Sequence, residues 1–127
     1  MKKANIQPFF IIRSSSHGLG VFAIKDIKKG HVLFKMTGLI KEAPTRTSVQ
    51  VGKHKHIEDR LAGFVNHSCH PTARIAKRAK SLISLRDVHK GDEVTFNYNK
   101  NEDKLAAPFK CDCCNKTICG RRNRRRQ

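Results

Sequence analysis

The chain has 127 residues, 38% of them apolar and only 6% aromatic, which suits one domain with a single hydrophobic core. Its apolar runs fall far short of the length that spans a bilayer, so the composition excludes a helical membrane protein. The net charge is +17, and a surface of that sign attracts polyanions, with nucleic acid the leading candidate and acidic membranes second.

The positive charge is spread along the whole chain. Five arginines lie in the tail 121–127, and removing them still leaves +12 on the other residues. Binding through such a surface should weaken steeply with salt, because it releases counterions. The alternative interpretation is a solvated, repulsive surface that only keeps the protein soluble.

The segment 1–16 has too short an apolar run for a signal peptide. Lys2 and Lys3 would suit one, but the apolar run Phe9–Ile12 is brief and Arg13 ends it. We therefore expect a soluble, intracellular protein of the cytoplasm, nucleoid or nucleus.

Short apolar or alternating stretches predict strands in chain order over 8–12, 20–24, 31–36, 48–51, 81–85 and 93–98. Glycine-containing turns separate them at 17–20, 28–30 and 90–92, and no segment repeats at a fixed period. Only 57–64 (IEDRLAGF) has helical spacing, and it predicts a helix of about two turns. The sequence thus predicts a mainly β domain with a cysteine-rich, basic C-terminal extension. His54 and His56, alternating on a further predicted strand, are interpreted as surface residues rather than metal ligands.

The cysteines predict a metal site. Four of the five lie in the run CDCCNKTIC, at Cys111, Cys113, Cys114 and Cys119, and the fifth is Cys69. Such close spacing is poor for disulfides and good for chelation, and thiolates in a tetrahedral cage select zinc. The run supplies at least three ligands, and the fourth is either local or Cys69. Free, reactive thiols beside many basic residues are the alternative.

Four segments of the chain resemble the successive signature segments of the SET-domain lysine methyltransferases, including their zinc-binding post-SET tail. They are HGLGVFAIKDIKKG (17–30), GFVNHSCHPTARI (63–75), LRDVHKGDEVTFNYN (85–99) and FKCDCCNKTICG (109–120). Each motif alone is weak, but four in this order are specific. The resemblance covers about residues 13 to 120.

The resemblance implies a mainly β fold of small, curved, β-clip-like sheets with a C-terminal pseudoknot. It divides the chain into a SET domain (1–107), a post-SET zinc-binding segment (108–120) and a basic, Arg-rich tail (121–127). The pseudoknot would bring residues 66–69 beside residues 96–98, although the two segments are far apart in the sequence.

The same resemblance implies a pocket for S-adenosylmethionine. The segment of His17, Gly18, Leu19 and Gly20 would form a tight turn whose glycines let the backbone approach the cofactor. Asn66 would hold the amino-acid end of the cofactor and His67 would lie near its adenine. Phe109 would pack over the cofactor, and Tyr98 would contact it. An ordinary loop without a cofactor is the alternative for residues 66–69.

Tyr98, the only tyrosine, matches the family's central active-site residue. Methyl transfer from a sulfonium requires a neutral lysine amine held about 3 Å from the methyl carbon. An apolar channel disfavours the charged form of lysine, and a phenol can then orient the amine. Phe96 matches the position that tunes how many methyl groups are added, and phenylalanine there favours di- or trimethylation. Packing in the core is the alternative for both residues.

Several residues depart from the family pattern. Met36 stands where a second active-site tyrosine is common, Thr72 replaces an asparagine and Asn97 replaces an aspartate. The spacing CxCxxxxC fits Cys114 better than Cys113. The expected zinc ligands are Cys69, Cys111, Cys113 and Cys119, with Cys114 as an alternative to Cys113.

Two functions follow. The first is a S-adenosylmethionine- and zinc-dependent protein-lysine methyltransferase that acts on a basic, nucleic-acid-associated protein such as a histone or histone-like protein. The second is a zinc-stabilised, basic nucleic-acid-binding module on a catalytically weak SET scaffold. Because a basic enzyme repels basic substrates, we expect it to contact DNA or RNA, partly through the tail 121–127, and to act beside that site. The acidic residues Glu42, Glu58, Asp59 and 102–103 are candidates for a peptide groove.

Overall fold

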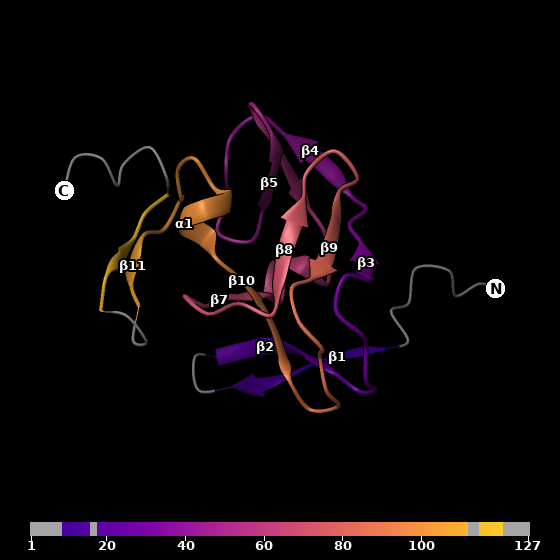
Figure 1. The fold of residues 1–127 in the computed structure, drawn as a ribbon. Coiled ribbons are helices and arrows are strands. Elements are labelled where there is room, and N and C mark those ends of the chain that lie inside the picture. Colours follow the sequence, from indigo (N-terminus) through magenta and orange to yellow (C-terminus); the bar gives the residue numbers. More distant parts are fainter. Residues whose placement is uncertain (1–8, 16–17, 112–114, 121–127) are drawn as a thin grey trace.

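The computed structural model describes residues 9–15, 18–111 and 115–120, and within these residues it forms four small sheets (Figure 1). The first has the order β1 (Phe10–Ser15), β2 (Gly18–Ala23), β10 (Glu93–Phe96) and β7 (Asn66–His67). The second consists of β3 (Val32–Lys35), β9 (Ser81–Ser84) and β8 (Ala73–Ala76), and the third of β4 (Leu39–Lys41), β6 (Lys55–Glu58) and β5 (Val49–Gly52). A two-stranded sheet pairs β11 (Phe109–Lys110) with β12 (Thr117–Ile118).

The prediction of a mainly β fold is confirmed, and a strand lies in each of the six predicted regions. In the last of these regions the strand ends at Phe96, and the single-turn helix α1 (Tyr98–Asn101) begins at Tyr98. The strand expected to carry His54 and His56 corresponds to β6, whereas β4 and β8 were not predicted, because their short sequences LIK and ARIA carry no clear alternation. They form by antiparallel pairing within the second and third sheets.

The predicted helix over 57–64 is wrong. Ile57 lies in the central strand β6, paired with Ile40 on one side and with Val49 on the other. The Asp59 carboxylate then accepts the backbone N–H groups of Leu61 (3.0 Å) and Ala62 (2.8 Å). This local side-chain bonding starts a turn, and only the 3-10 helix η1 (Ala62–Phe64) follows.

Two similar segments, 26–30 (DIKKG) and 87–91 (DVHKG), form a reciprocal double turn that the sequence analysis did not recognise as a repeat. Ile27 and Val88 exchange backbone hydrogen bonds of 2.7 and 2.8 Å. The aspartate that opens each segment accepts the backbone N–H of the lysine in the other, at 2.8 and 2.9 Å. Each segment ends in a glycine with positive φ. The double turn fixes the loop that leads into β10.

The strands β7 and β10 pair in parallel, with Thr95 beside Asn66 and Phe96 beside His67. The backbone N–H of Ser68 donates to the carbonyl of Phe96 at 3.1 Å. The expected juxtaposition of residues 66–69 with residues 96–98 is therefore confirmed. In Figure 1, β7 and α1 lie on either side of the end of β10, and β11 lies beyond α1.

His56, which was predicted to lie at the surface, is buried. His56 is only 5% exposed, because β6 is the central strand of its sheet, so its interpretation as a surface residue is wrong. Its Nδ1 atom is buried without a hydrogen-bond partner in the described residues. Burial lowers the pKa of this imidazole. His54, in contrast, is exposed at the tip of the β5–β6 hairpin.

Candidate functional site

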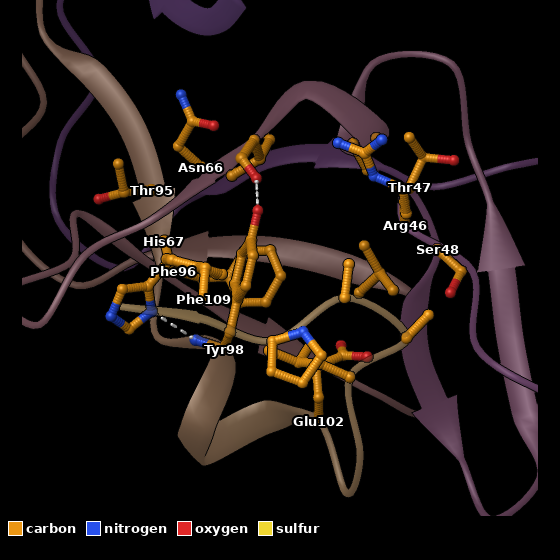
Figure 2. A pocket seen from close by; sticks show the side chains of 18 of the residues that line it. Arg46, Thr47, Ser48, Asn66, His67, Thr95, Phe96, Tyr98, Glu102 and Phe109 are labelled. Carbon is orange, nitrogen blue, oxygen red and sulfur yellow. Dashed lines mark hydrogen bonds between the residues drawn. The ribbon is translucent and has the colours of Figure 1, made fainter. Parts of the chain in front are cut away.

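A cavity of about 600 Å³ opens between the segments 45–49, 62–68, 93–98 and 102–111. Its walls therefore come from the loop before β5, from the η1–β7 segment, from the end of β10 and from the segment before β11. Figure 2 places the Tyr98 ring in the middle, with Asn66 and His67 on one side and Arg46, Thr47 and Ser48 on the other. A volume of this size holds a small-molecule ligand.

Tyr98 is fixed at both ends. Its backbone N–H donates to Nδ1 of His67 at 3.0 Å, and its hydroxyl donates to the carbonyl of Val65 at 2.5 Å. Burial, followed by the negative charges of Glu102 and Glu93, raises the pKa of the phenol. The hydroxyl therefore stays protonated at neutral pH and points along the η1–β7 wall of the cavity.

Aromatic side chains surround Tyr98. The Phe96 ring centroid lies 4.8 Å from that of Tyr98, and the His67 ring lies 5.4 Å away. Phe109 is 40% exposed, and its ring centroid lies 6.0 Å from those of Tyr98 and His67 in a T-shaped arrangement with each. The predicted residues Phe96, Tyr98, His67 and Phe109 thus share one wall of the cavity, although three separate segments supply them.

Asn66 stands at the other end of the cavity wall. Its Nδ2 atom donates to the Leu19 carbonyl at 3.1 Å and to Oε2 of Glu93 at 2.7 Å. A Cβ on Gly20 would lie 2.4 Å from that same Oε2 atom. Glu93 was not among the predicted site residues, and its only signal was its place at the start of the strand that leads to Tyr98.

The predicted tight turn over 17–20 is only partly right. Gly18 has a φ of +100°, as expected at the end of a turn, but Leu19 and Gly20 lie in β2, paired with β1. Gly20 is needed for space rather than for turn geometry. Among the described residues, 18–20 do not line the cavity and reach it through the Leu19 carbonyl. His17 lies outside the described residues.

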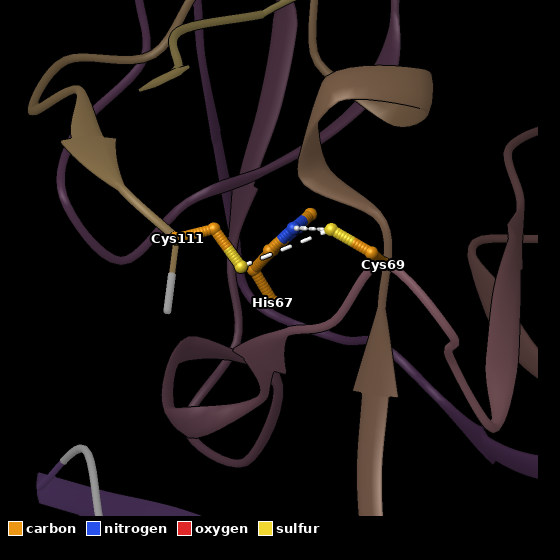
Figure 3. A group of neighbouring side chains, drawn as sticks. All are labelled: His67, Cys69 and Cys111. Atoms are coloured by element: carbon orange, nitrogen blue, oxygen red, sulfur yellow. Dashed lines mark hydrogen bonds between the residues drawn. The ribbon is translucent and has the colours of Figure 1, made fainter. Parts of the chain in front are cut away.

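Two of the predicted zinc ligands approach each other closely. The sulfur atoms of Cys69 and Cys111 are 3.8 Å apart, and Nε2 of His67 lies 3.5 Å from the Cys69 sulfur (Figure 3). Two thiolates bound to one tetrahedral zinc at about 2.3 Å each are about 3.8 Å apart. His67, Cys69 and Cys111 therefore form a group that could hold a metal ion.

The hydrogen bonds of His67 favour a supporting role over ligation. Burial lowers the pKa of its imidazole to about 4, so the ring carries one hydrogen at neutral pH. Nδ1 accepts the Tyr98 N–H, which assigns that hydrogen to Nε2. Nε2 then donates toward the Cys69 sulfur and has no lone pair for a metal ion. His67 thus connects the cysteine pair to Tyr98.

Cys119 is buried and follows β12, with its backbone N–H donating to Asn99 at 3.1 Å. It does not belong to the group of His67, Cys69 and Cys111, as far as the described residues show. Cys113 and Cys114 lie outside those residues. The complete ligand set therefore stays a prediction.

The three departures from the family pattern have local explanations. Met36 is 1% exposed in the core and is not among the described residues that line the cavity. The hydroxyl of Thr72 accepts the Thr95 N–H at 2.9 Å and donates to the Glu93 carbonyl at 3.1 Å. Asn97 accepts the backbone N–H of residue 100 and caps α1, as an aspartate could.

Glu102, like Glu93, is an acidic residue of the cavity wall whose contacts were not predicted from the sequence. It is 2% exposed, and its Oε2 atom accepts the backbone N–H of Gln50 (2.8 Å) and the side-chain amide of Asn101 (2.7 Å). Burial raises the pKa of this carboxyl. Of the acidic residues that were candidates for a peptide groove, Glu102 lines the cavity, whereas Glu58 is held by the hydroxyls of Thr45 and Thr47.

Comparison with known proteins gives a family match over much of the chain. A family model described as SET domain matches residues 18–99. A histone-lysine N-methyltransferase of Yarrowia lipolytica, H3 lysine-36 specific, is 28% identical over an alignment that covers 86% of this chain and 17% of the relative. Histone-lysine N-methyltransferase ASHH2 of Arabidopsis thaliana is 27% identical over 88% of this chain and 8% of its own length. The H3 lysine-36 specific enzyme of Candida glabrata is 30% identical over 87% of this chain and 18% of its own length.

This chain spans less than a fifth of the length of these relatives. No helix in the described part of the chain is long and apolar enough to cross a membrane.

Proposed function

Because the chain belongs to the SET-domain family, we propose that it transfers methyl groups from S-adenosylmethionine to the ε-amine of a lysine in a protein. The observation that carries this proposal is the position of the Tyr98 hydroxyl. It lies in the wall of a cavity between the polar end at Asn66 and the loop 45–48. The cavity thus has space for the cofactor on one side of the Tyr98 phenol and for a lysine side chain on the other.

The cavity has features that fit the cofactor. Asn66 and Glu93 place acceptors at one end, and Gly20 leaves the space that Glu93 occupies. The rings of His67 and Phe109 provide an aromatic edge for an adenine. When bound, S-adenosylmethionine supplies a methyl group on a positively charged sulfur. Leu19 would support the site through its carbonyl, and a contribution of His17 and Gly18 to cofactor binding stays a prediction.

Tyr98 would orient the lysine amine rather than deprotonate it. Its raised pKa keeps the phenol neutral, and its hydrogen is directed to the Val65 carbonyl. The oxygen lone pairs are then available to accept an N–H from the amine. The apolar rings around the phenol disfavour a charged ammonium, so the lysine loses its proton to water before it reacts. Orientation of this kind contributes to the rate mainly by removing unproductive poses.

Phe96 would help to set the number of methyl groups. It is 3% exposed and packs against the Tyr98 ring, and it brings no hydroxyl into the cavity. Without a hydroxyl to hold a water molecule there, the site has room for a methylated amine to rotate. We therefore propose di- or trimethylation, which mass spectrometry of the product would test.

We propose that zinc joins the segment 108–120 to the domain that precedes it. Cys69 and Cys111 would supply two thiolates, Cys119 and either Cys113 or Cys114 the other two. The segment 105–111 forms one wall of the cavity, so the metal would hold that wall in place. In this organisation residues 1–107 are the SET domain and residues 121–127 a basic tail.

The charge of the chain supports a substrate near nucleic acid. The carboxylates of Asp26, Asp87 and Asp92 accept backbone N–H groups in turns, and no lysine or arginine among the described residues pairs with them. The relatives named above are histone-lysine methyltransferases, and we propose a basic substrate such as a histone or histone-like protein inside the cell. Nucleic acid would bring this substrate and the basic enzyme together. Removing 121–127 should weaken DNA binding and reduce its salt dependence; unchanged values would exclude the tail from this role.

The net charge of +17 also favours the second function, a basic nucleic-acid-binding module on a catalytically weak scaffold. One experiment separates the two. Transfer of labelled methyl from S-adenosylmethionine to a panel of basic DNA-bound proteins is measured for the wild type and for Tyr98→Phe. The variant keeps the ring packing and loses the hydroxyl, so we expect its rate to fall by roughly a hundredfold. Wild-type rates in the variant would refute the role of Tyr98. If the zinc-loaded protein neither transferred methyl groups nor bound the cofactor, the methyltransferase function would be refuted, and the nucleic-acid-binding module would be the remaining proposal.

A further inference from the structure

Glu93 is a half-buried carboxylate that has no role at the reacting atoms. It opens β10, lines the cavity and lies beside Gly20 of β2 and Asn66 of β7. The chain has 27 lysines and arginines, yet no basic side chain pairs with Glu93 within residues 9–15, 18–111 and 115–120. Its one described side-chain contact is the amide of Asn66, at 2.7 Å. A negative charge left in a cavity of such a basic protein favours a cationic ligand there.

The contact with Glu93 also decides which way the Asn66 amide faces. Nδ2 donates one hydrogen to Glu93 and the other to the Leu19 carbonyl, and neither of these groups can donate in return. A flipped amide would place its oxygen against two acceptors. The Asn66 oxygen, Oδ1, is therefore held as the free acceptor, and no hydrogen bond reaches it from the described residues. This end of the cavity presents two kinds of acceptor oxygen and one negative charge.

Gly20 is part of the same arrangement. A Cβ at this position would lie 2.4 Å from Oε2 of Glu93 and 3.0 Å from Nδ2 of Asn66, so the carboxylate would have to leave its present position and the amide would have to shift slightly. The glycine has no positive φ that would otherwise explain it. Three segments that are far apart in the sequence thus meet to place one carboxylate beside one amide.

From this geometry we propose that Glu93 binds the ammonium group at the amino-acid end of S-adenosylmethionine and positions Asn66 to share in that contact. This role rests on the proposed function, because it needs the cofactor to occupy the cavity. An ammonium has three N–H donors and a full positive charge, which matches the acceptors on Glu93 and Asn66. The contact is distinct from the chemistry at Tyr98, so it should affect cofactor affinity more than the methyl-transfer step.

The test compares two ligands by calorimetry on the full, zinc-loaded chain. S-adenosylhomocysteine carries the ammonium, whereas 5′-methylthioadenosine keeps the nucleoside and the sulfur and lacks the amino-acid end. The variant Glu93→Gln preserves the size and one acceptor and removes the charge. We expect it to bind S-adenosylhomocysteine about ten- to a hundredfold more weakly, as for a lost hydrogen bond to a charged group, and 5′-methylthioadenosine within about twofold of the wild type.

Asp92→Asn is the matched control. It removes the same charge from the neighbouring residue, whose carboxylate accepts the His89 N–H and does not line the cavity. Its affinity for both ligands should stay at the wild-type value. Glu93→Asp retains the charge on a shorter side chain and should restore part of the preference for S-adenosylhomocysteine. Thermal unfolding of each variant confirms that it is folded.

Each outcome bears on a different claim. Unchanged affinity of Glu93→Gln for S-adenosylhomocysteine, or an equal loss for both ligands, would overturn the role of Glu93 and leave the proposed function intact. If the zinc-loaded wild type bound neither ligand, the proposed function and the role of Glu93 would fall together. A loss confined to S-adenosylhomocysteine, absent in Asp92→Asn, would support the assignment.

Discussion

Gly20→Ala adds one methyl group at the point where β2, β7 and β10 meet. The new Cβ would lie 2.4 Å from Oε2 of Glu93, so the carboxylate has to move away and lose its 2.7 Å hydrogen bond to Asn66. A hydrogen bond to a charged group contributes about 1.5 to 3 kcal/mol, with the lower value appropriate for a half-buried one. Replacing glycine restricts the unfolded chain and returns about 0.4 to 1 kcal/mol. The free energy of unfolding should therefore fall by about 1 kcal/mol.

Urea unfolding measures this change, and calorimetry with S-adenosylhomocysteine should show about tenfold weaker binding. Gly52→Ala is the control, because the nearest atom to its added Cβ is a lysine side-chain carbon at 3.4 Å. It should be neutral or slightly stabilising. In a Glu93→Ala background, Gly20→Ala should cost much less, since the carboxylate at 2.4 Å is gone and only the 3.0 Å approach to the Asn66 amide remains. A cost of the same size in both backgrounds would refute the explanation.

Three further predictions follow from the packing. Gly38→Ala should lower the free energy of unfolding by at least about 2 kcal/mol. Residue 38 has a φ of +136°, and the added Cβ would lie 2.1 Å from the backbone oxygen of Glu58. A smaller loss in urea unfolding would contradict this reasoning. Chelation of zinc should speed hydrogen exchange of the backbone amides in residues 105–120 and leave the exchange rates in the sheet of β3, β9 and β8 unchanged. Faster exchange throughout the chain would argue against a local metal site. Glu102→Gln should become more stable relative to the wild type as the pH rises above 4.5. Folding raises the pKa of the Glu102 carboxyl, so ionisation at higher pH destabilises the wild type and leaves the glutamine variant unaffected. A difference in unfolding free energy that does not vary with pH would exclude this cause.

Strands and tight turns could be predicted from the sequence, because they depend on residues close together in the chain. Alternating stretches such as 93–98 predicted strands, and Gly30 and Gly91 marked turns that do require positive φ. The resemblance to the SET family, rather than any local pattern, predicted that Asn66, Tyr98 and Cys69 share one region, and the parallel pairing of β7 with β10 brings them together.

The failures come from register between distant segments. The stretch 57–64 has helical spacing, but its first residues pair with strands on both sides, which no local pattern reveals. His56 is buried for the same reason. The contact of Glu93 with Asn66 depends on how β10 sits between β2 and β7, so composition and spacing could not predict it.

Tyr98 is the only tyrosine, and the chain has no tryptophan. When light too long in wavelength for its seven phenylalanines excites the protein, the intrinsic ultraviolet fluorescence comes from a single phenol in the wall of the proposed catalytic cavity. The backbone N–H of Tyr98 donates to His67, which in turn contacts the Cys69 sulfur, and the Tyr98 hydroxyl donates to the carbonyl of Val65. A ligand entering the cavity, a metal ion leaving the cysteines or an alkaline titration would each change the same emission band. The protein thus carries an optical reporter at its site, with no other tyrosine and no tryptophan to mask it.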